Sequence, residues 1–232
     1  MVLETFIEHE ATRAEIYKLL SDSFYPPDEA VYAKTKTLHK NIGMYCPGEI
    51  RSSGVRENKA PSWKDHLEIK VDHARLFVGP YTLLAPPYGS VYLDTERRIM
   101  GNSTFDVVNC YRNAGLMVTE DYKNPPDHIA VELEFMHFLI VKEIKATTEE
   151  NFLDFASTLN KQQTFLDTHL CPWIFEFVDN VERNAQTSFY RSLARITKAY
   201  VRYDFQTVTS MANSLHGGGS ELKNSEPLNI HP

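Results

Sequence analysis

The residues of this chain that could perform chemistry are carboxylates and histidines at helical spacing. Glu134 and His137 stand three positions apart, and a Glu-x-x-His pair of this kind supplies ligands to dinuclear metal centres in helical bundles. Such a centre needs the motif on two helices, and the sequence has no second clear copy. We therefore predict no bound metal and no cofactor. The alternative function that we retain is a helical-bundle metal-binding enzyme that uses Glu134, His137 and nearby carboxylates.

Motifs for nucleophilic and nucleotide chemistry are missing from the sequence. The pairs Asp72-His73 and Asp127-His128 are not ready-made acid–base dyads, because neighbouring residues on a helix do not face each other. Gly89-Ser90-Val91 lacks the second glycine of G-x-S-x-G, and neither a Walker A motif nor a G-x-G-x-x-G fingerprint occurs. The three cysteines form no C-x-x-C pair. We predict no catalytic residue and a protein that is not an enzyme.

The composition is that of a soluble globular protein, with 42% hydrophobic and 24% charged residues in a chain of 232. The formal net charge of −7 argues against non-specific nucleic-acid binding, and it is compatible with a basic peptide as partner. Glu4, Glu8 and Glu10 lie where a signal peptide would need a basic start, and no uncharged run reaches bilayer length. We expect a cytoplasmic protein with no stable membrane insertion.

The elements that must position these residues are helices, because apolar residues recur at helical spacing and no period-2 pattern of any length occurs. The predicted fold class is all-α, a single compact bundle of about seven to nine helices, and Val91-Tyr92-Leu93 is the only short strand-like run. The predicted helices span 2–23, 28–44, 63–77, 104–117, 127–145, 149–169, 172–188 and 189–211. The predicted domain covers 1–212, with an N-terminal half (1–117), a hinge (118–126) and C-terminal helices (127–212), and a flexible tail follows at 213–232.

Local signals refine these helices. Asp28 and Asp127 are plausible N-caps, and Thr147-Thr148-Glu149-Glu150 has the character of a fresh helix start. The apolar face expected for helix 63–77 comprises Leu67, Val71, Ala74 and Phe77. The apolar face expected for helix 127–145 comprises Ile129, Leu133, Met136 and Ile140.

The segment from Gly79 to Tyr92 differs from an ordinary connection. Its three prolines and two glycines argue against a helix, yet it is apolar and aromatic where a loop would normally be polar. An ordered loop packed against the body is the natural solution. Such a loop either carries function or merely covers the core, and the sequence leaves both alternatives open.

Four segments of the chain resemble the TorD/DmsD/NarJ family of redox-enzyme maturation chaperones. They are Tyr17–Pro26, Asp72–Pro80, Ala85–Tyr92 and Pro125–Met136, and together they anchor a resemblance over roughly residues 10–205. Members of the family often carry Glu-Pro-x-Asp-His before the fourth segment. Here Pro125, Asp127 and His128 match this pattern, whereas Asn124 stands at the glutamate position.

The resemblance implies a cytoplasmic chaperone. It would bind the twin-arginine signal peptide of a catalytic subunit, and it would guard that subunit until its cofactor is inserted and the enzyme is exported. The client would be a molybdopterin-dependent oxidoreductase with molybdenum or tungsten, and the sequence does not identify which one. The oligomeric state stays open between a monomer and a helix-swapped homodimer, because hinges such as 118–126 are where swapping occurs.

A twin-arginine leader has a basic front and an apolar middle, so its receptor needs carboxylates beside an apolar surface. Asp127, Glu132 and Glu134 are expected to pair with the arginines, and His128 to orient Asp127 or contact the peptide. The other predicted peptide-binding residues are Asp72, Arg75, Tyr81, Leu84, Tyr88, Ser90 and Tyr92. The structural alternatives are a helix cap for Asp127, core tyrosines at 88 and 92, a solvated Glu134, and an Arg75 that holds the fold through Asp72 or Glu132.

Overall fold

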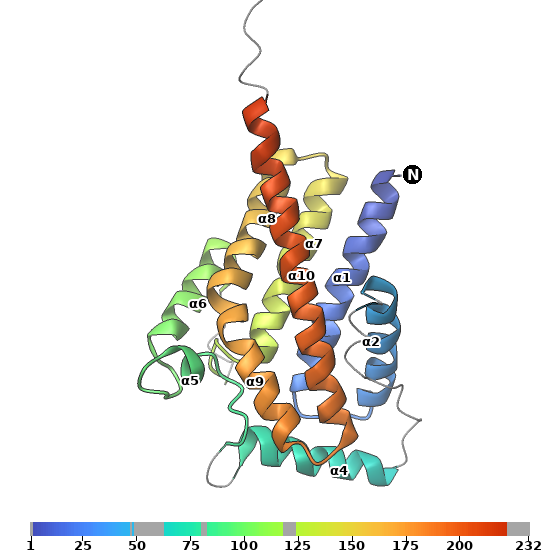
Figure 1. Cartoon of the computed structure of the whole chain (residues 1–232), viewed down its shortest axis with the longest axis vertical. Helices are drawn as coiled ribbons and strands as arrows, with labels where there is room; N and C mark the ends of the chain where they lie inside the picture. Colours follow the sequence, from blue (N-terminus) through green and yellow to red (C-terminus); the bar gives the residue numbers. More distant parts are fainter. Residues whose placement is uncertain (1, 47, 49–62, 80–82, 118–123, 222–232) are drawn as a thin grey trace, which may run out of the picture.

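The chain folds into a bundle of α-helices in the computed structural model, which describes residues 2–46, 48, 63–79, 83–117 and 124–221 (Figure 1). Within these ranges no residue belongs to a β-strand, and an isolated antiparallel bridge joins Tyr88 to His128. The predicted all-α fold class is therefore confirmed. None of the described helices is both long enough and apolar enough to cross a membrane.

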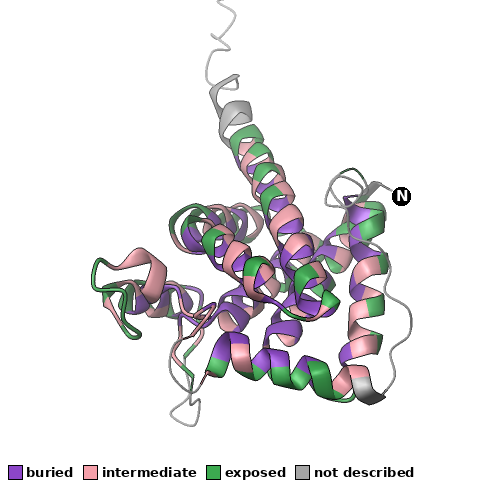
Figure 2. Ribbon diagram, turned by 60° about the horizontal axis from the view of Figure 1, so that its bottom comes forward, coloured by how far each residue is buried: buried purple, intermediate pink, exposed green. Residues whose placement is uncertain are grey.

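The helices at the centre of the bundle run along its axis in Figure 1. They are α1 (Val2–Phe24), α7 (Ile129–Thr148), α8 (Phe152–Phe165) and α10 (Ser188–Glu221). α1 packs on α7, α7 on α8, and α8 on α10. In Figure 2 the buried residues lie on the sides of the helices that face one another, and the exposed residues lie outside.

The remaining helices cover the sides and one end of this centre. α2 (Val31–Tyr45) packs on α1, and α9 (Cys171–Asn184) packs on α10. α4 (Trp63–His73) crosses the lower end of the bundle in Figure 1, and it ends in a π-helical turn at Ala74–Val78. A second π-helical turn, Leu166–Leu170, joins α8 to α9. α5 (Ser90–Leu93) and α6 (Asn102–Asn113) lie to one side, next to α9 and α8 in the view of Figure 1.

The core confirms the apolar face expected for α7 and contradicts the one expected for α4. Ile129, Leu133, Met136 and Ile140 are all fully buried, because they form one stripe at helical spacing that faces α1 and α8. Of the face predicted for 63–77, Phe77 is buried as expected, but Leu67 and Val71 are more than half exposed and Ala74 is exposed. The polar Asp72 and His73 are buried instead. The α4 face is rotated because Asp72 and His73 find hydrogen-bond partners inside the fold.

Several predicted boundaries also differ from the structure. Ala30 rather than Asp28 precedes α2, and the Asp28 carboxylate accepts a hydrogen bond from the Ala30 amide at 3.0 Å. Val91-Tyr92-Leu93 forms the single helical turn α5, so the expectations of a strand-like run and of a helix-free segment 79–92 are both wrong. α7 continues through Thr148, and Asn151 rather than Thr147 caps α8 by accepting from the Asp154 amide at 3.1 Å.

The predicted tail and hinge are described only in part. α10 continues to Glu221, past residue 213 where the tail was expected to begin, because Leu215 still packs against the core. Residues 222–232 lie outside the described part of the chain, and so do residues 118–123 of the predicted hinge. The division of the domain into two halves therefore stays a prediction.

Candidate functional site

The loop before α5 pairs with the residues that lead into α7, and this pairing builds the candidate site. The Gly89 amide donates to the Asp127 carbonyl at 2.9 Å, and the Ile129 amide donates to the Pro87 carbonyl at 2.9 Å. The Asp127 side chain accepts from the Ser90 amide at 2.8 Å through Oδ2. Residues 87–90 and 127–129, about forty positions apart, are thereby held side by side.

His128 is the N-cap of α7, a position that the sequence analysis gave to Asp127. Its ring nitrogen Nδ1 accepts a hydrogen bond from the Ala130 amide at 3.1 Å, which satisfies one of the free amides of the first turn. Burial, together with nearby His73, lowers the pKa of His128 to about 4, so the ring is neutral at physiological pH. The ring stacks on Tyr25 at 5.9 Å and meets the edge of Tyr88 at 5.4 Å between centroids.

Glu132 lies one turn into α7 and is fully buried. Its Oε2 accepts from the indole nitrogen of Trp173 at 3.1 Å. Burial raises the pKa of Glu132 well above its ordinary value, and the neighbouring Asp127 raises it further, against the lowering effect of the Trp173 hydrogen bond. Gly89 fits above this pair because a Cβ there would stand 3.1 Å from the Trp173 nitrogen and 3.2 Å from Glu132 Oε1.

Three buried polar atoms of this cluster have no hydrogen-bond partner among the described residues. They are Asp127 Oδ1, Glu132 Oε1 and Ser90 Oγ. Buried polar atoms are nearly always hydrogen-bonded in folded proteins, and each exception asks for an explanation. Two carboxylate oxygens and one hydroxyl of one small region are therefore free to accept or exchange hydrogen bonds with a group that enters it.

Half-buried aromatic rings border the buried carboxylates. Tyr88 and Tyr25 flank His128, and Tyr92 stacks on Trp173 at 5.5 Å between centroids with an interplanar angle of 26°. Burial raises the pKa of Tyr92 to about 12, so its hydroxyl stays protonated. These rings offer large, rigid surfaces with polar tips, which is the type of side chain that dominates binding hot spots.

Asp72 and Arg75 hold the fold instead of lining this cluster. Asp72 Oδ2 accepts from the amides of Gln186 and Thr187 at 3.0 and 2.8 Å, at the start of α10. Arg75 donates to Asp72 Oδ1 at 2.9 Å and also to the Asn184 carbonyl at the end of α9. These contacts match the alternative in which Arg75 holds the fold through Asp72.

The other predicted residues lie apart from the cluster. Glu134 is about half exposed and pairs with Lys18 of α1 at 2.7 Å. His137 shares a hydrogen bond with the Ala14 carbonyl at 2.9 Å, so the pair considered for metal chemistry is engaged with α1. Leu84 is half-buried against the core, and Tyr81 lies outside the described residues. Within the described ranges, no group of three or more His, Cys, Asp or Glu residues is arranged to hold a metal ion.

A buried ionic network around Arg13 escaped the sequence analysis. The guanidinium is fully buried, and it donates to Asp204 at 2.6 Å, to Glu10 at 2.8 Å and to Gln162 at 2.7 Å. Glu143 lies 3.5 Å from the same group, and burial raises the pKa of Glu143 to about 7 against the lowering effect of Arg13. The network joins α1, α7, α8 and α10. Helical spacing connects only Glu10 to Arg13, because the other partners are far away in the sequence.

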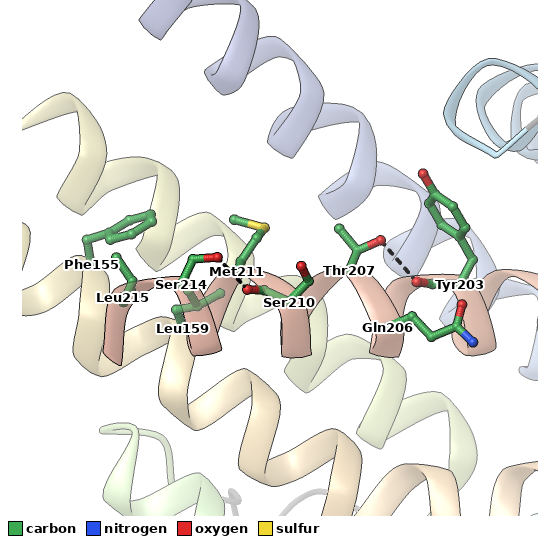
Figure 3. Close-up of a pocket in the computed structure, with 9 residues that line it drawn as sticks. All are labelled: Phe155, Leu159, Tyr203, Gln206, Thr207, Ser210, Met211, Ser214 and Leu215. Carbon is green, nitrogen blue, oxygen red and sulfur yellow. Dashed lines mark hydrogen bonds between the residues drawn. The ribbon is translucent and has the colours of Figure 1, made fainter. Parts of the chain in front are cut away.

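A groove of about 570 Å³ lies elsewhere, between α8 and α10 (Figure 3). It is lined by uncharged residues: Phe155, Leu159, Tyr203, Gln206, Thr207, Ser210, Met211, Ser214 and Leu215. The hydroxyls of Thr207 and Ser214 donate to helix carbonyls one turn earlier, at 3.0 and 2.9 Å, which leaves a largely apolar lining. None of the predicted peptide-binding residues lines this groove.

Comparisons with known proteins assign the chain to a family. A family model described as the nitrate reductase delta subunit matches residues 28–179, more than half of the chain. The chain is 26% identical over 210 residues to the chaperone protein TorD of Vibrio parahaemolyticus, covering 83% of this chain and 92% of that protein. It is 30% identical over 141 residues to the Tat proofreading chaperone DmsD of Salmonella typhimurium, covering 60% and 62% of the two chains.

The chain is also similar to a solved structure of a redox enzyme maturation protein from Archaeoglobus fulgidus, with 23% sequence identity and a TM-score of 0.47. The alignment covers 82% of this chain and 92% of that one. The family model and the curated relatives agree on a class of chaperones. The chain belongs to the nitrate reductase delta subunit family, the family of TorD, DmsD and NarJ, and the resemblance found in the sequence is thereby confirmed.

Proposed function

We propose that this protein is a cytoplasmic redox-enzyme maturation chaperone that binds the twin-arginine signal peptide of a molybdopterin-dependent oxidoreductase subunit. It assists cofactor insertion and assembly of that subunit before export, and it catalyses no reaction itself. The family of the chain and its similarity to the chaperones TorD and DmsD support this proposal.

The observation that carries the binding site is a pair of buried carboxylate oxygens, Asp127 Oδ1 and Glu132 Oε1, for which the described part of the chain offers no hydrogen-bond partner. A guanidinium offers five donors in a planar fork and carries the charge that two neighbouring carboxylates require. An arginine of the leader that enters between the 87–90 segment and α7 would satisfy both oxygens. Lysine, with a compact and strongly hydrated ammonium, would satisfy them less well.

The aromatic border receives the apolar part of the leader in this proposal. Tyr25, Tyr88 and Tyr92 are half-buried, so each still exposes ring surface beside the carboxylates. Because Asp127 and Glu132 are themselves buried, entry of the arginine requires the 87–90 segment to shift away from α7. Binding is therefore expected to follow an opening step, and closing of the segment over the peptide would then exclude water.

Calorimetric titration of the full chain with a synthetic twin-arginine leader peptide tests the proposal. Asp127→Asn keeps an oxygen for the Ser90 amide and removes the charge, and we expect it to weaken binding by roughly 10- to 150-fold, the loss of a hydrogen bond to a charged group. Glu149→Gln, on an exposed carboxylate at the far end of α7, is the matched control and should bind normally. A leader with lysines in place of both arginines should bind like the Asp127 variant. Equal affinity of both variants and both peptides would move the site elsewhere.

A further inference from the structure

Cys110 and His169 form a thiol–imidazole pair outside the proposed peptide site. The Cys110 sulfur lies 3.2 Å from His169 Nε2, and both side chains are partly exposed. The two residues come from elements 59 positions apart, α6 and the π-helical turn that joins α8 to α9. π-Helical turns are rare and are frequent at functional sites, and this turn directs the imidazole toward α6.

The surroundings define the resting state of the pair. Burial raises the pKa of the Cys110 thiol, and Asp106 and Glu132 raise it further. Burial lowers the pKa of His169, while Asp106 opposes that effect. The resting pair is therefore a neutral thiol beside a neutral imidazole, and a role of His169 as base requires the tautomer in which the thiol donates to Nε2. Asp106, one turn before Cys110 on α6, is placed to stabilise an imidazolium whenever His169 takes the proton.

A nucleophile hydrogen-bonded to a base is the general arrangement for activating a thiol, and here Asp106 acts on the base through its charge alone. We propose that Cys110 is a peroxide-sensitive modification site and that His169 is its base. The Cys110 sulfur attacks one oxygen of hydrogen peroxide, the O–O bond breaks, and the thiol proton passes through His169 to the leaving hydroxide, which departs as water. The sulfur is oxidised to a sulfenic acid and the peroxide is reduced.

Oxidation of Cys110 can affect the segment that leads into α7, because the next residue along the chain contacts it. The next residue, Tyr111, donates its hydroxyl to the Pro126 carbonyl at 2.9 Å, directly before Asp127. An oxygen added to Cys110 needs space beside the 3.2 Å contact between the sulfur and His169, and we expect α6 to shift away from the π-helical turn to provide it. Oxidation is thus expected to disturb the entrance to α7, and reduction by a thiol restores it.

The chain supplies its own internal controls. Cys171 is also partly exposed, burial raises its pKa to about 12, and no hydrogen bond joins it to a histidine among the described residues. Cys46 is buried. If exposure alone governed oxidation, Cys110 and Cys171 would react at similar rates.

The test is oxidation of the full-length protein by hydrogen peroxide in the presence of dimedone, which traps sulfenic acids, followed by peptide mass mapping. We expect Cys110 to be trapped about 10²-fold faster than Cys171, the size of a typical general-base contribution, and His169→Gln to remove that advantage while the melting temperature stays unchanged. Asp106→Asn, at an exposed position whose charge acts on His169, should give an intermediate rate. Equal trapping of Cys110 and Cys171 in the wild type, or an unchanged Cys110 rate in His169→Gln, would overturn the proposal.

Discussion

Replacing Glu132 by glutamine separates the charge of this buried side chain from its shape. Glutamine has nearly the same volume, and its amide oxygen can still accept the hydrogen bond that Trp173 donates at 3.1 Å. The fold should therefore tolerate the change, because no cavity is created and no donor loses its acceptor. What disappears is the ability to become an anion when an arginine enters the cluster.

The size of the effect follows from the protonation state of Glu132. Burial raises the pKa of Glu132 well above its ordinary value, so below that pKa the free protein holds a neutral carboxylic acid there. A guanidinium at Oε1 favours the carboxylate, so wild-type protein should release a proton on binding, and its affinity should rise with pH. Without the charge, binding loses one charge-assisted hydrogen bond, about 1.5–3 kcal/mol, or roughly 10- to 150-fold in affinity.

The assay is calorimetric titration with the twin-arginine peptide in two buffers that differ in ionisation enthalpy. The dependence of the apparent enthalpy on the buffer counts the protons released. We expect about one proton for the wild type at pH values below the pKa of Glu132, and none for Glu132→Gln, by proton linkage. Asp127→Asn distinguishes the contributions of the two carboxylates. It should weaken binding but still release a proton, because Glu132 can still ionise. A wild type that releases no proton, or a Glu132→Gln variant with wild-type affinity, would refute the idea that an arginine enters this cluster.

Three further variants test other parts of the fold by urea or thermal denaturation. Arg13→Met leaves the carboxylates of its network buried without their cation, and it should lose about 3–5 kcal/mol, or roughly 10 °C in melting temperature. Burial raises the pKa of Glu143 from 4.5 to about 7, so the contribution of this carboxyl group to stability falls as the pH rises through that window, and Glu143→Gln should remove a loss of roughly 3 kcal/mol. Burial lowers the pKa of His128 from 6.5 to about 4, so the contribution of this imidazole to stability falls as the pH falls through that window. His128→Asn keeps an N-cap acceptor, and it should lose roughly 3 kcal/mol less on acidification. Parallel pH profiles of variant and wild type would contradict either of the last two expectations.

The titrations of His128 and Glu143 change the stability of the protein in opposite directions near pH 5–6. Acidification destabilises the fold through His128 and stabilises it through Glu143, over windows that overlap between pH 4.5 and 6.5. The two effects have similar sizes and opposite signs, so they largely cancel. The change of stability with pH that each group causes can be measured by itself only when the other group is replaced.

Periodicity predicted the parts of the fold in which apolar burial alone decides the conformation. The face of α7 is correct because Ile129, Leu133, Met136 and Ile140 form a continuous stripe. The face of α4 is wrong because polar contacts decide its orientation: Asp72 caps the start of α10, more than a hundred residues later. No periodic pattern records a polar side chain that turns inward to meet a distant backbone amide.

The candidate site was predictable in composition and only partly in geometry. Adjacency in the sequence and the family resemblance brought Asp127, His128 and Glu132 together, and the structure joins them to the loop that carries Tyr88 and Ser90. The burial of Asp127 and Glu132 was not predictable, since burial of a carboxylate depends on partners such as Trp173 from another helix. The predicted N-cap of α7 was Asp127 and the observed one is His128. Helix boundaries inferred from local sequence are seldom accurate to one residue.

The ion pair between Arg13 and Asp204 links the first helix of the chain to the last, across 191 positions. A ribosome adds about 5–20 residues per second, so roughly 10–40 seconds separate the synthesis of the two residues. Throughout that interval Arg13 lacks Asp204, and Glu10 on the same helix is the first of its partners to be made. We therefore expect the Arg13 side of α1 to become fully buried only late in synthesis, after residue 204 has been added.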